Sequence, residues 1–374
     1  MTDVPTPQAQ VPRGADQLAE RLLAAALGAV DLLSIYLGDR LGWYRSLLAD
    51  GPATADQLAD RTGTNARYAR EWLEQQAVTG LLAVAPVADK GSAPVGEDRS
   101  GRIFSLPAAT AEVLTDERSM AYLAPMARIF AAAGGQLPAL LEAYRTGGGV
   151  AWAQYGADAR ESQADMNRPW YERALHDALH GVPAVDRPLH RPGARIADVG
   201  CGAGWSTIAL ARAYPEATID GFDIDGPSVE LARANAAGTE VADRVVVRAG
   251  DAAQIPRTSY DAVFAFECVH DMPRPVEVLT AARRALAPGG SVIVMDEAVA
   301  ETFTAPGDEL ERLMYGFSLV VCLPDGMSHP PSAATGTVMR PGTLGEYARA
   351  AGFARTEVLP IHDFGFWRFY QLSG

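Results

Sequence analysis

Cysteine, lysine and long apolar runs are scarce in this chain of 374 residues. The three cysteines, Cys201, Cys268 and Cys322, form no C-x-x-C pair, so the sequence predicts neither a disulfide framework nor a cysteine-based metal site. No run of 18 uninterrupted apolar residues occurs, and residues 1–14 are polar and contain proline, unlike a signal peptide. We therefore expect a cytoplasmic protein without a membrane span.

Positive charge is also scarce. The chain has 32 Lys and Arg residues, of which Lys90 is the single lysine, against 46 Asp and Glu, and its formal net charge is −14. Such a field repels phosphate backbones and anionic membrane surfaces. We expect neither nucleic acid nor a membrane as a partner.

The length exceeds that of a typical single domain, and a composition of 48% hydrophobic and 21% charged residues is that of an ordinary globular protein. We predict a winged-helix-like dimerisation domain over residues 15–119, a helical bridge and active-site cover over 120–185, and an α/β domain over 186–374. The proline-containing segment 182–193 is interpreted as the loop that enters the α/β domain.

Apolar periodicity and a helix-capping motif predict helices in the N-terminal part. Residues 15–50 carry apolar residues at helical spacing and predict two or more amphipathic helices, interrupted at Gly38 and Gly42. Thr54 and Gln57 fit a capping box, which starts a helix that runs to Gly63.

A second helix from about Asn65 to Gly80, a strand at 81–84, a loop at 85–101 and a return strand at 103–106 complete the order of a winged helix. In a DNA-binding winged-helix domain the second helix should be basic, but the positive charges of Arg67 and Arg70 are balanced by the negative charges of Glu71 and Glu74. The charge favours dimerisation or scaffolding over DNA binding.

From Ala194 onward strands and helices alternate, which predicts a parallel sheet covered by helices on both faces. Seven strands are expected. They lie at residues 195–199, 218–223, 244–248, 261–266, 291–296, 354–360 and 366–372.

A glycine-rich segment follows the first of these strands and opens a helix at 205–213. Without side chains, Gly200, Gly202 and Gly204 allow a sharp turn and close approach of a ligand to the backbone, and the helix N-terminus favours a negative group. Asp223 ends the second strand, where a carboxylate can accept hydrogen bonds from both hydroxyls of a ribose. The alternative is that Asp223 or Asp225 caps the helix that starts near Ser228.

Five segments together resemble the class I S-adenosylmethionine (SAM)-dependent methyltransferase superfamily. They are D-V-G-C-G-A-G at 198–204, G-F-D-I-D at 221–225, A-G-D-A at 249–252, Y-D-A-V-F-A-F-E at 260–267 and L-A-P-G-G-S-V-I-V at 286–294. A dinucleotide fingerprint would read G-x-G-x-x-G, whereas this loop reads G-x-G-x-G. With its N-terminal part, the chain is similar to actinobacterial small-molecule methyltransferases that carry a winged-helix domain.

The resemblance implies a Rossmann-like sheet of seven strands, the last antiparallel, with SAM across the carboxyl ends of the strands. The glycines would flank the methionine part of SAM, Asp223 the ribose, Asp251 and Ala252 the adenine, and Phe266 and Glu267 the sulfonium. The full set of cofactor-binding residues implied is Gly200, Gly202, Gly204, Asp223, Ile224, Asp251, Ala252, Phe266 and Glu267.

Methyl transfer to a group that must lose a proton benefits from a general base. Glu267 and His270 follow the fourth strand and are the catalytic candidates, His270 because its intrinsic pKa is near neutral. The alternative for His270 and Asp271 is to cap the helix that begins near Pro275. Asp296 and Glu297 either bind substrate or an ion, or cap a loop.

A histidine pair, an insertion and a set of aromatic residues give weaker indications of function. His176 and His180 have the i,i+4 spacing of a metal pair but no carboxylate at the expected spacing, so we expect no metal. An insertion at about 298–343, with a helix at 308–321 and a loop at 324–336, is a candidate lid. Aromatic residues that could shape an apolar acceptor pocket, or simply pack in the core, are Trp152, Tyr155, Trp170, Tyr171, Tyr315 and Phe317.

The sequence therefore predicts a homodimeric enzyme that transfers a methyl group from SAM to an O, N or C atom of a small molecule. Two alternatives stay open: a SAM-binding winged-helix transcriptional regulator, and a non-methylating protein on the same fold.

Overall fold

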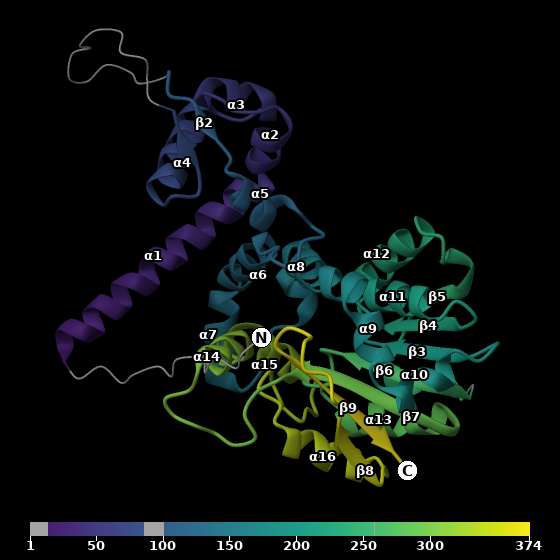
Figure 1. The fold of residues 1–374 in the computed structure, drawn as a ribbon. Coiled ribbons are helices and arrows are strands. Elements are labelled where there is room, and N and C mark those ends of the chain that lie inside the picture. The colour runs from purple at the N-terminus through teal and green to yellow at the C-terminus, as the bar shows by residue number, and fades with distance from the viewer. Residues whose placement is uncertain (1–13, 86–100, 258) are drawn as a thin grey trace. The chain divides into compact units, whose positions relative to one another are not determined.

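The structure is a computed structural model that describes residues 14–85, 101–257 and 259–374 (Figure 1). These residues divide into two compact units between Ala131 and Ala132. The segment expected as a bridge, residues 120–185, falls on both sides of this boundary, and most of the loop expected at 85–101 lies outside the described residues.

The N-terminal unit begins with a long helix, α1 (Ala15–Arg40), followed by α2 (Trp43–Ala49). The predicted interruption at Gly38 is wrong, because α1 runs through this position. A Cβ at Gly38 would lie 2.3 Å from a ring carbon of Trp72, so glycine is there for close packing and not to end a helix. Gly42 does end the segment, with a φ of 72°.

The next elements occur in the predicted winged-helix order. Thr54 and Gln57 form the capping box that starts α3 (Ala55–Thr62), and Asn65 caps α4 (Ala66–Val78). Strands β1 (Ala83–Val84) and β2 (Phe104–Ser105) pair antiparallel. Helices α5 (Ala108–Thr115) and α6 (Ala124–Gly135) follow.

One face of α1 is apolar and exposed. Its large apolar side chains retain between 46% and 63% of their accessible surface; they are Leu18, Leu22, Leu23, Leu27, Val30, Leu33 and Leu37. Of the helices that the structure describes, α1 alone has the length and apolar composition to cross a membrane, a test that core helices and leader sequences of soluble proteins also pass.

Four helices precede the sheet of the second unit: α7 (Leu137–Thr146), α8 (Trp152–Arg173), α9 (Leu175–His180) and α10 (Pro183–Leu189). The interpretation of 182–193 as a loop is wrong for α10. Pro183 occupies its first position, where a missing N–H costs no hydrogen bond, and Val185 and Leu189 are buried.

A seven-stranded sheet forms the centre of this unit, in the order β5-β4-β3-β6-β7-β9-β8. The expected strands are present with ends within two residues of those predicted, apart from β7, which begins at Leu286 rather than Ser291. They are β3 (Arg195–Val199), β4 (Thr218–Asp223), β5 (Val245–Ala249), β6 (Tyr260–Phe266), β7 (Leu286–Glu297), β8 (Arg355–Val358) and β9 (Trp367–Ser373).

Among the seven strands described for this sheet, β9 alone runs in the opposite direction, antiparallel to both β7 and β8, as the resemblance implied. The strand order reverses between β3 and β6, so the loops at their carboxyl ends border the crevice where open α/β sheets bind ligands. Buried apolar residues cover both faces of the sheet. The helices between the strands are α11 (Trp205–Ala213), α12 (Gly226–Ala237), α13 (Pro275–Ala285) and α16 (Pro341–Ala350).

The insertion after β7 is more helical than predicted. Asp308 caps α14 (Glu309–Phe317), which continues through a π-helical turn, η3 (Ser318–Cys322), into α15 (Leu323–Met327). The loop predicted from 324 therefore starts later, because Pro324 stands in the first turn of α15, where proline is tolerated.

Candidate active site

The glycine-rich loop after β3 has two packed positions and one open position. Gly200, Gly202 and Gly204 all have positive φ, at 68°, 51° and 79°. A Cβ at Gly200 would lie 2.7 Å from the Cβ of Cys268, and one at Gly204 would lie 2.9 Å from the Cβ of Ala232. Nothing lies within 4 Å of that point at Gly202, so a ligand can approach the backbone there.

Asp223 lies beside this loop at the end of β4. Its Oδ2 accepts a hydrogen bond from the Gly202 N–H at 2.8 Å, and its Oδ1 accepts one from the Asp225 N–H at 2.8 Å. Burial raises the pKa of Asp223, while these donors favour its ionised form. Asp225, and not Asp223, caps α12 by accepting from the Ser228 N–H.

These atoms fit the cofactor that the resemblance implies. Each oxygen of Asp223 keeps a second lone pair for a ligand hydroxyl. The neighbouring Ile224 side chain is 75% exposed and offers apolar surface next to the carboxylate. Together with the open backbone at Gly202, this is the surface that a nucleoside needs: a hydrogen-bond acceptor, an apolar contact and room.

Asp251, the predicted adenine contact, already has partners. It caps the short helix η2 (Ala252–Gln254), its Oδ1 accepts from the Ala253 N–H at 2.8 Å, and its Oδ2 lies 3.2 Å from a guanidinium nitrogen of Arg274. An adenine amino group would have to share the Asp251 carboxylate with the Ala253 N–H and Arg274. The roles of Asp251 and Ala252 in binding adenine stay predictions.

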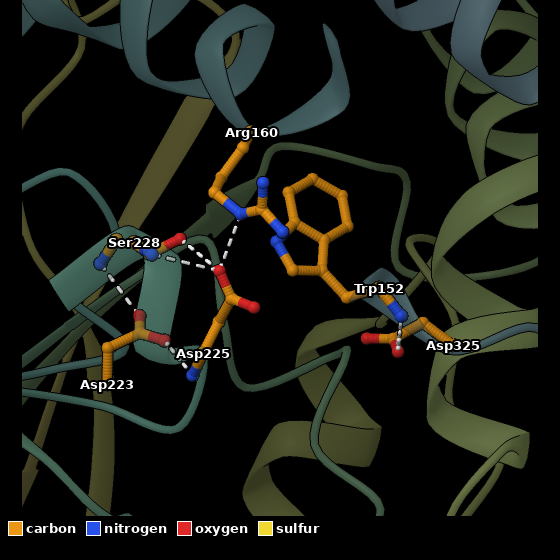
Figure 2. Close-up of polar contacts among 7 residues, drawn as sticks. Trp152, Arg160, Asp223, Asp225, Ser228 and Asp325 are labelled. Carbon is orange, nitrogen blue, oxygen red and sulfur yellow. Dashed lines mark hydrogen bonds and ion pairs between the residues drawn. The ribbon is translucent and has the colours of Figure 1, made fainter. Parts of the chain in front are cut away.

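Helix α8 contacts helix α15 and the residue that caps α12 (Figure 2). The Trp152 N–H donates to Oδ1 of Asp325 in α15 at 2.7 Å, and Nε of Arg160 donates to Oδ2 of Asp225 at 2.6 Å. Gly156, between them, has φ 74° and ψ −159°, which interrupts the helix. Burial is the main cause that raises the pKa of Asp325 to about 7.

A third contact of α8 is with Glu267, directly after β6. The side-chain amide of Asn167 donates to Oε2 of Glu267, and Gln163 donates to the same oxygen at 3.3 Å. Glu267 has a positive φ of 47°, a strained backbone for a non-glycine residue. Burial raises its pKa to about 7.

His270 stands at the centre of a buried acidic cluster. Its Nδ1 lies 2.9 Å from Oδ1 of Asp296 and 3.3 Å from Oε2 of Glu297. Its Nε2 lies 3.3 Å from Oδ1 of Asp271, without the geometry of a hydrogen bond. The capping alternative for His270 and Asp271 is wrong, because α13 starts after Arg274 with no side-chain cap.

In this cluster three carboxyl groups, those of Asp271, Asp296 and Glu297, surround the single imidazole of His270. Burial alone would lower the pKa of His270, but Asp271, Asp296 and Glu297 raise it well above its ordinary value. Burial opposes ionisation of Asp296, yet His270 lowers the pKa of that carboxyl, while burial raises the pKa of Glu297. The geometry therefore supports an imidazolium–carboxylate pair beside a protonated Glu297.

Asp296 and Glu297 lie inside β7, and not in a loop that they could cap. Their ligand-capable oxygens and the His270 nitrogen lie within 4.8 Å of one another, as do those of His270, Asp271 and Cys322. Because His270, Asp296 and Glu297 are each at most 4% exposed, without room for the water that usually completes the coordination of a metal ion, we interpret this cluster as acid–base machinery.

The predicted aromatic residues separate into three environments. Trp152 and Tyr155 have ring centroids 6.3 Å apart, and the Tyr155 hydroxyl donates to the carbonyl of Val320 in η3 at 2.8 Å. Tyr171 packs in the core against Phe266, with ring centroids 5.5 Å apart.

Tyr315 lies on the exposed side of α14, in a surface pocket that Phe303 and Leu319 also line. Phe317, at the end of α14, is half-buried. In the same environment as Tyr171, the Trp170 ring lies 5.6 Å from that of Phe364. The structure thus brings Trp152 and Tyr155 close to Asp325 and places Tyr171 and Trp170 in packing roles.

The residues of α8 and α15 that meet the site were not predicted from the sequence: Arg160, Gln163, Asn167 and Asp325. No motif or spacing marks them, because each is defined by a contact with a residue more than sixty positions away along the chain.

Two family models match the chain. Residues 190–320 match a model described as a methyltransferase domain, and residues 28–116 match one described as an Rv2258c-like winged HTH domain. The second match begins within α1 and ends just after α5, so it contains the helices and strands that show the winged-helix order.

A relative and two solved structures agree with these matches. The 27-O-demethylrifamycin SV methyltransferase of Amycolatopsis mediterranei is 33% identical over 160 residues, which cover 41% of this chain and 57% of that protein, little more than half its length. The structure of the mitomycin 7-O-methyltransferase is similar at a TM-score of 0.67 and 22% identity, over 96% of this chain and 98% of the other. Human N-acetylserotonin methyltransferase, solved in complex with SAM, has a TM-score of 0.68 at 18% identity, over 97% and 99%.

Proposed function

We propose that this chain, which belongs to the class I SAM-dependent methyltransferases, transfers the methyl group of SAM to an oxygen atom of a small molecule. The observation that carries the proposal is the buried pair of His270 and Asp296 at the carboxyl end of the sheet, near the open glycine loop. A hydroxyl must lose its proton to accept a methyl group, and this pair supplies the base.

When bound, SAM supplies an electrophilic methyl group on a sulfonium ion. Asp223 would accept hydrogen bonds from the ribose hydroxyls, the backbone at Gly202 would face the methionine part, and Ile224 would offer apolar surface to the cofactor. The remaining residues proposed to line the cofactor site are Gly200, Gly204, Asp251, Ala252, Phe266 and Glu267.

His270 accepts the acceptor's proton at Nε2, while Asp296 holds the Nδ1–H and orients the ring. Because the carboxyl groups raise the pKa of His270, the imidazolium must first pass its Nε2 proton on. Oδ1 of Asp271 lies 3.3 Å from Nε2 and its side chain is 35% exposed, so Asp271 can relay this proton to solvent, and the proton taken from the acceptor leaves by the same route after transfer. Glu267, whose carboxylate is held by two amides, positions rather than reacts.

We further propose a cytoplasmic homodimer formed through the apolar face of α1. A 26-residue helix is about 39 Å long, and a row of exposed leucines of this length is typical of a surface that another apolar surface buries. A second copy presents the same face, so a two-fold pair can bury both. Light scattering should show a dimer that Leu23→Glu with Leu27→Glu converts to a monomer, while Glu20→Gln does not. Binding to lipid vesicles in place of dimerisation would indicate a membrane.

The regulator alternative has little support in the charges of α4. Arg67 pairs with Glu71 four residues later, and Glu74 pairs with Arg102. These pairs neutralise the helix that a winged-helix reader would insert into a major groove. Salt-dependent binding to duplex DNA at physiological ionic strength would revive this alternative.

The proposed function is tested in two steps. Calorimetry with SAM and S-adenosylhomocysteine should give micromolar binding. Mass spectrometry should then detect a methylated product from a panel of phenols and hydroxylated natural products, with matched amines and O-methylated analogues as controls. No binding of either ligand would overturn the cofactor, and product from the amines alone would overturn transfer to oxygen.

A further inference from the structure

The geometry points to a Zn²⁺ site formed by His180, Asp186 and His190, at the opposite end of the sheet from the candidate active site. Nδ1 of His180 lies 3.1 Å from Oδ2 of Asp186, and Nε2 of His190 lies 3.1 Å from Oδ1 of the same carboxylate. All three ligand atoms lie within 4.8 Å of one another.

These separations match those of ligands that share one metal ion. Zinc binds imidazole nitrogen and carboxylate oxygen at about 2.0 to 2.2 Å, so neighbouring ligand atoms in a tetrahedral site lie about 3.0 to 3.5 Å apart. Two imidazoles and one carboxylate are a known zinc set, in which water completes the fourth position. The histidine side chains are 68% and 42% exposed, which leaves room for water and for the small rotations that bring them onto one ion.

The surroundings of Asp186 favour a cation. The residue is only 4% exposed, and a buried carboxylate needs a positive partner. Its Oδ1 also accepts a hydrogen bond from the Tyr214 hydroxyl at 3.2 Å, the kind of outer contact that orients a ligating carboxylate. The net charge of −14 attracts cations to the chain as a whole.

The position of the site separates it from catalysis. His180 ends α9, Asp186 lies in the first turn of α10, and His190 follows α10, five residues before β3 begins. The glycine loop follows the other end of β3. A zinc ion here would cross-link α9 to α10 and stabilise the entry into the sheet, without touching substrate.

The sequence pattern does not predict this set of three ligands, because the spacing H-x5-D-x3-H spans two short helices. From the i,i+4 spacing, His180 was considered together with His176 instead. His176 stacks on His180, with ring centroids 5.8 Å apart, but its Nδ1 contacts Asp177. It is therefore the matched control: a histidine on the same helix, equally able to bind metal by itself, that the proposed set does not use.

The test is a titration of ZnCl₂ into the full-length, tag-free protein after dialysis against a chelator, followed by calorimetry and thermal unfolding. We expect one equivalent of Zn²⁺ to bind and to raise Tm. His180→Ala and His190→Ala should each weaken binding at least about 10-fold and abolish the rise in Tm, Tyr214→Phe should weaken binding roughly 10-fold, and His176→Ala should change neither.

Asp186→Asn should also lose the site, but this variant can fail to fold because Asp186 is buried. The exposed His180 gives the decisive variant for that reason, and circular dichroism confirms its fold. Absence of saturable binding below millimolar Zn²⁺, or equal binding by wild type and His180→Ala, would overturn the site.

Discussion

Nδ1 of His270 lies 2.9 Å from Oδ1 of Asp296, and both side chains are almost completely buried, at 3% and 1% exposure. The pair joins the loop after β6 to the end of β7, two adjacent parallel strands. Because burial makes an unpaired charge costly, the two residues are expected to act as a unit.

The first prediction follows from this pair. His270→Ala and Asp296→Asn should each lower kcat by roughly 100-fold or more, because the base is lost or misoriented, while SAM binding survives. The double variant should be no slower than either single one. Glu277→Gln, an exposed change on α13, is the control and should leave kcat unchanged. Full turnover by Asp296→Asn would show that proximity alone drives transfer.

A second prediction concerns Asp223. Asp223→Ala should weaken SAM binding by about 1.5 to 3 kcal/mol, because charge-assisted hydrogen bonds to the ribose are lost. Calorimetry measures this directly. Glu230→Gln, an exposed change on α12, should leave the affinity unchanged. An Asp223→Ala protein that folds and binds SAM like wild type would remove Asp223 from the cofactor site.

The glycine loop allows a matched comparison. Gly202 and Gly193 both have positive φ, 51° and 72°, and open space where a Cβ would lie, but Gly193 precedes β3. Alanine at either position should destabilise the fold by about 1 to 2 kcal/mol through backbone strain. Only Gly202→Ala should also lose SAM affinity. Equal affinities of the two variants would show that no ligand approaches Gly202.

The ion pair of Arg160 and Asp225 is tested by a double-mutant cycle. Its side chains are 14% and 11% exposed, so Arg160→Ala should cost about 1 to 3 kcal/mol of unfolding free energy, and Asp225→Asn should show coupling to it. Denaturant unfolding measures both. The exposed pair of Arg233 and Glu230 is the control and should couple by less than about 1 kcal/mol. Additive costs at Arg160 and Asp225 would mean that α8 is not anchored there.

The pH dependence of stability depends on Glu267 and Asp325. Their pKa is about 7 in the folded chain, whereas unfolded carboxyls titrate near about 4. Between these values the folded state binds protons that the unfolded state has released, so stability should fall as pH rises from about 5 to 7. Glu267→Gln and Asp325→Asn should each reduce this slope in Tm measured from pH 5 to 8. A slope unchanged in both variants would assign it to other groups.

The sequence by itself determined the features that depend on local chemistry. Thr54 and Gln57 form their capping box because both partners lie within four residues. The alternation of strands and helices after Ala194 predicted the parallel sheet, since period and order follow from neighbouring residues, whereas the antiparallel last strand was implied by the resemblance to the methyltransferase family. The loop that contains Gly202 was predicted for the same reason, because the residues on either side of it have the local patterns of a strand and a helix.

Tertiary structure decided what depends on distant partners. Gly38 continues a helix because Trp72 occupies the space beside it. His270 becomes a paired base, and not a helix cap, because β7 lies beside β6 and brings Asp296 within 2.9 Å. Asp186 joins His180 and His190 only when α10 folds back on α9. These contacts arise from the packing of separate elements, and no spacing in the sequence encodes the distance between two side chains that meet across a sheet.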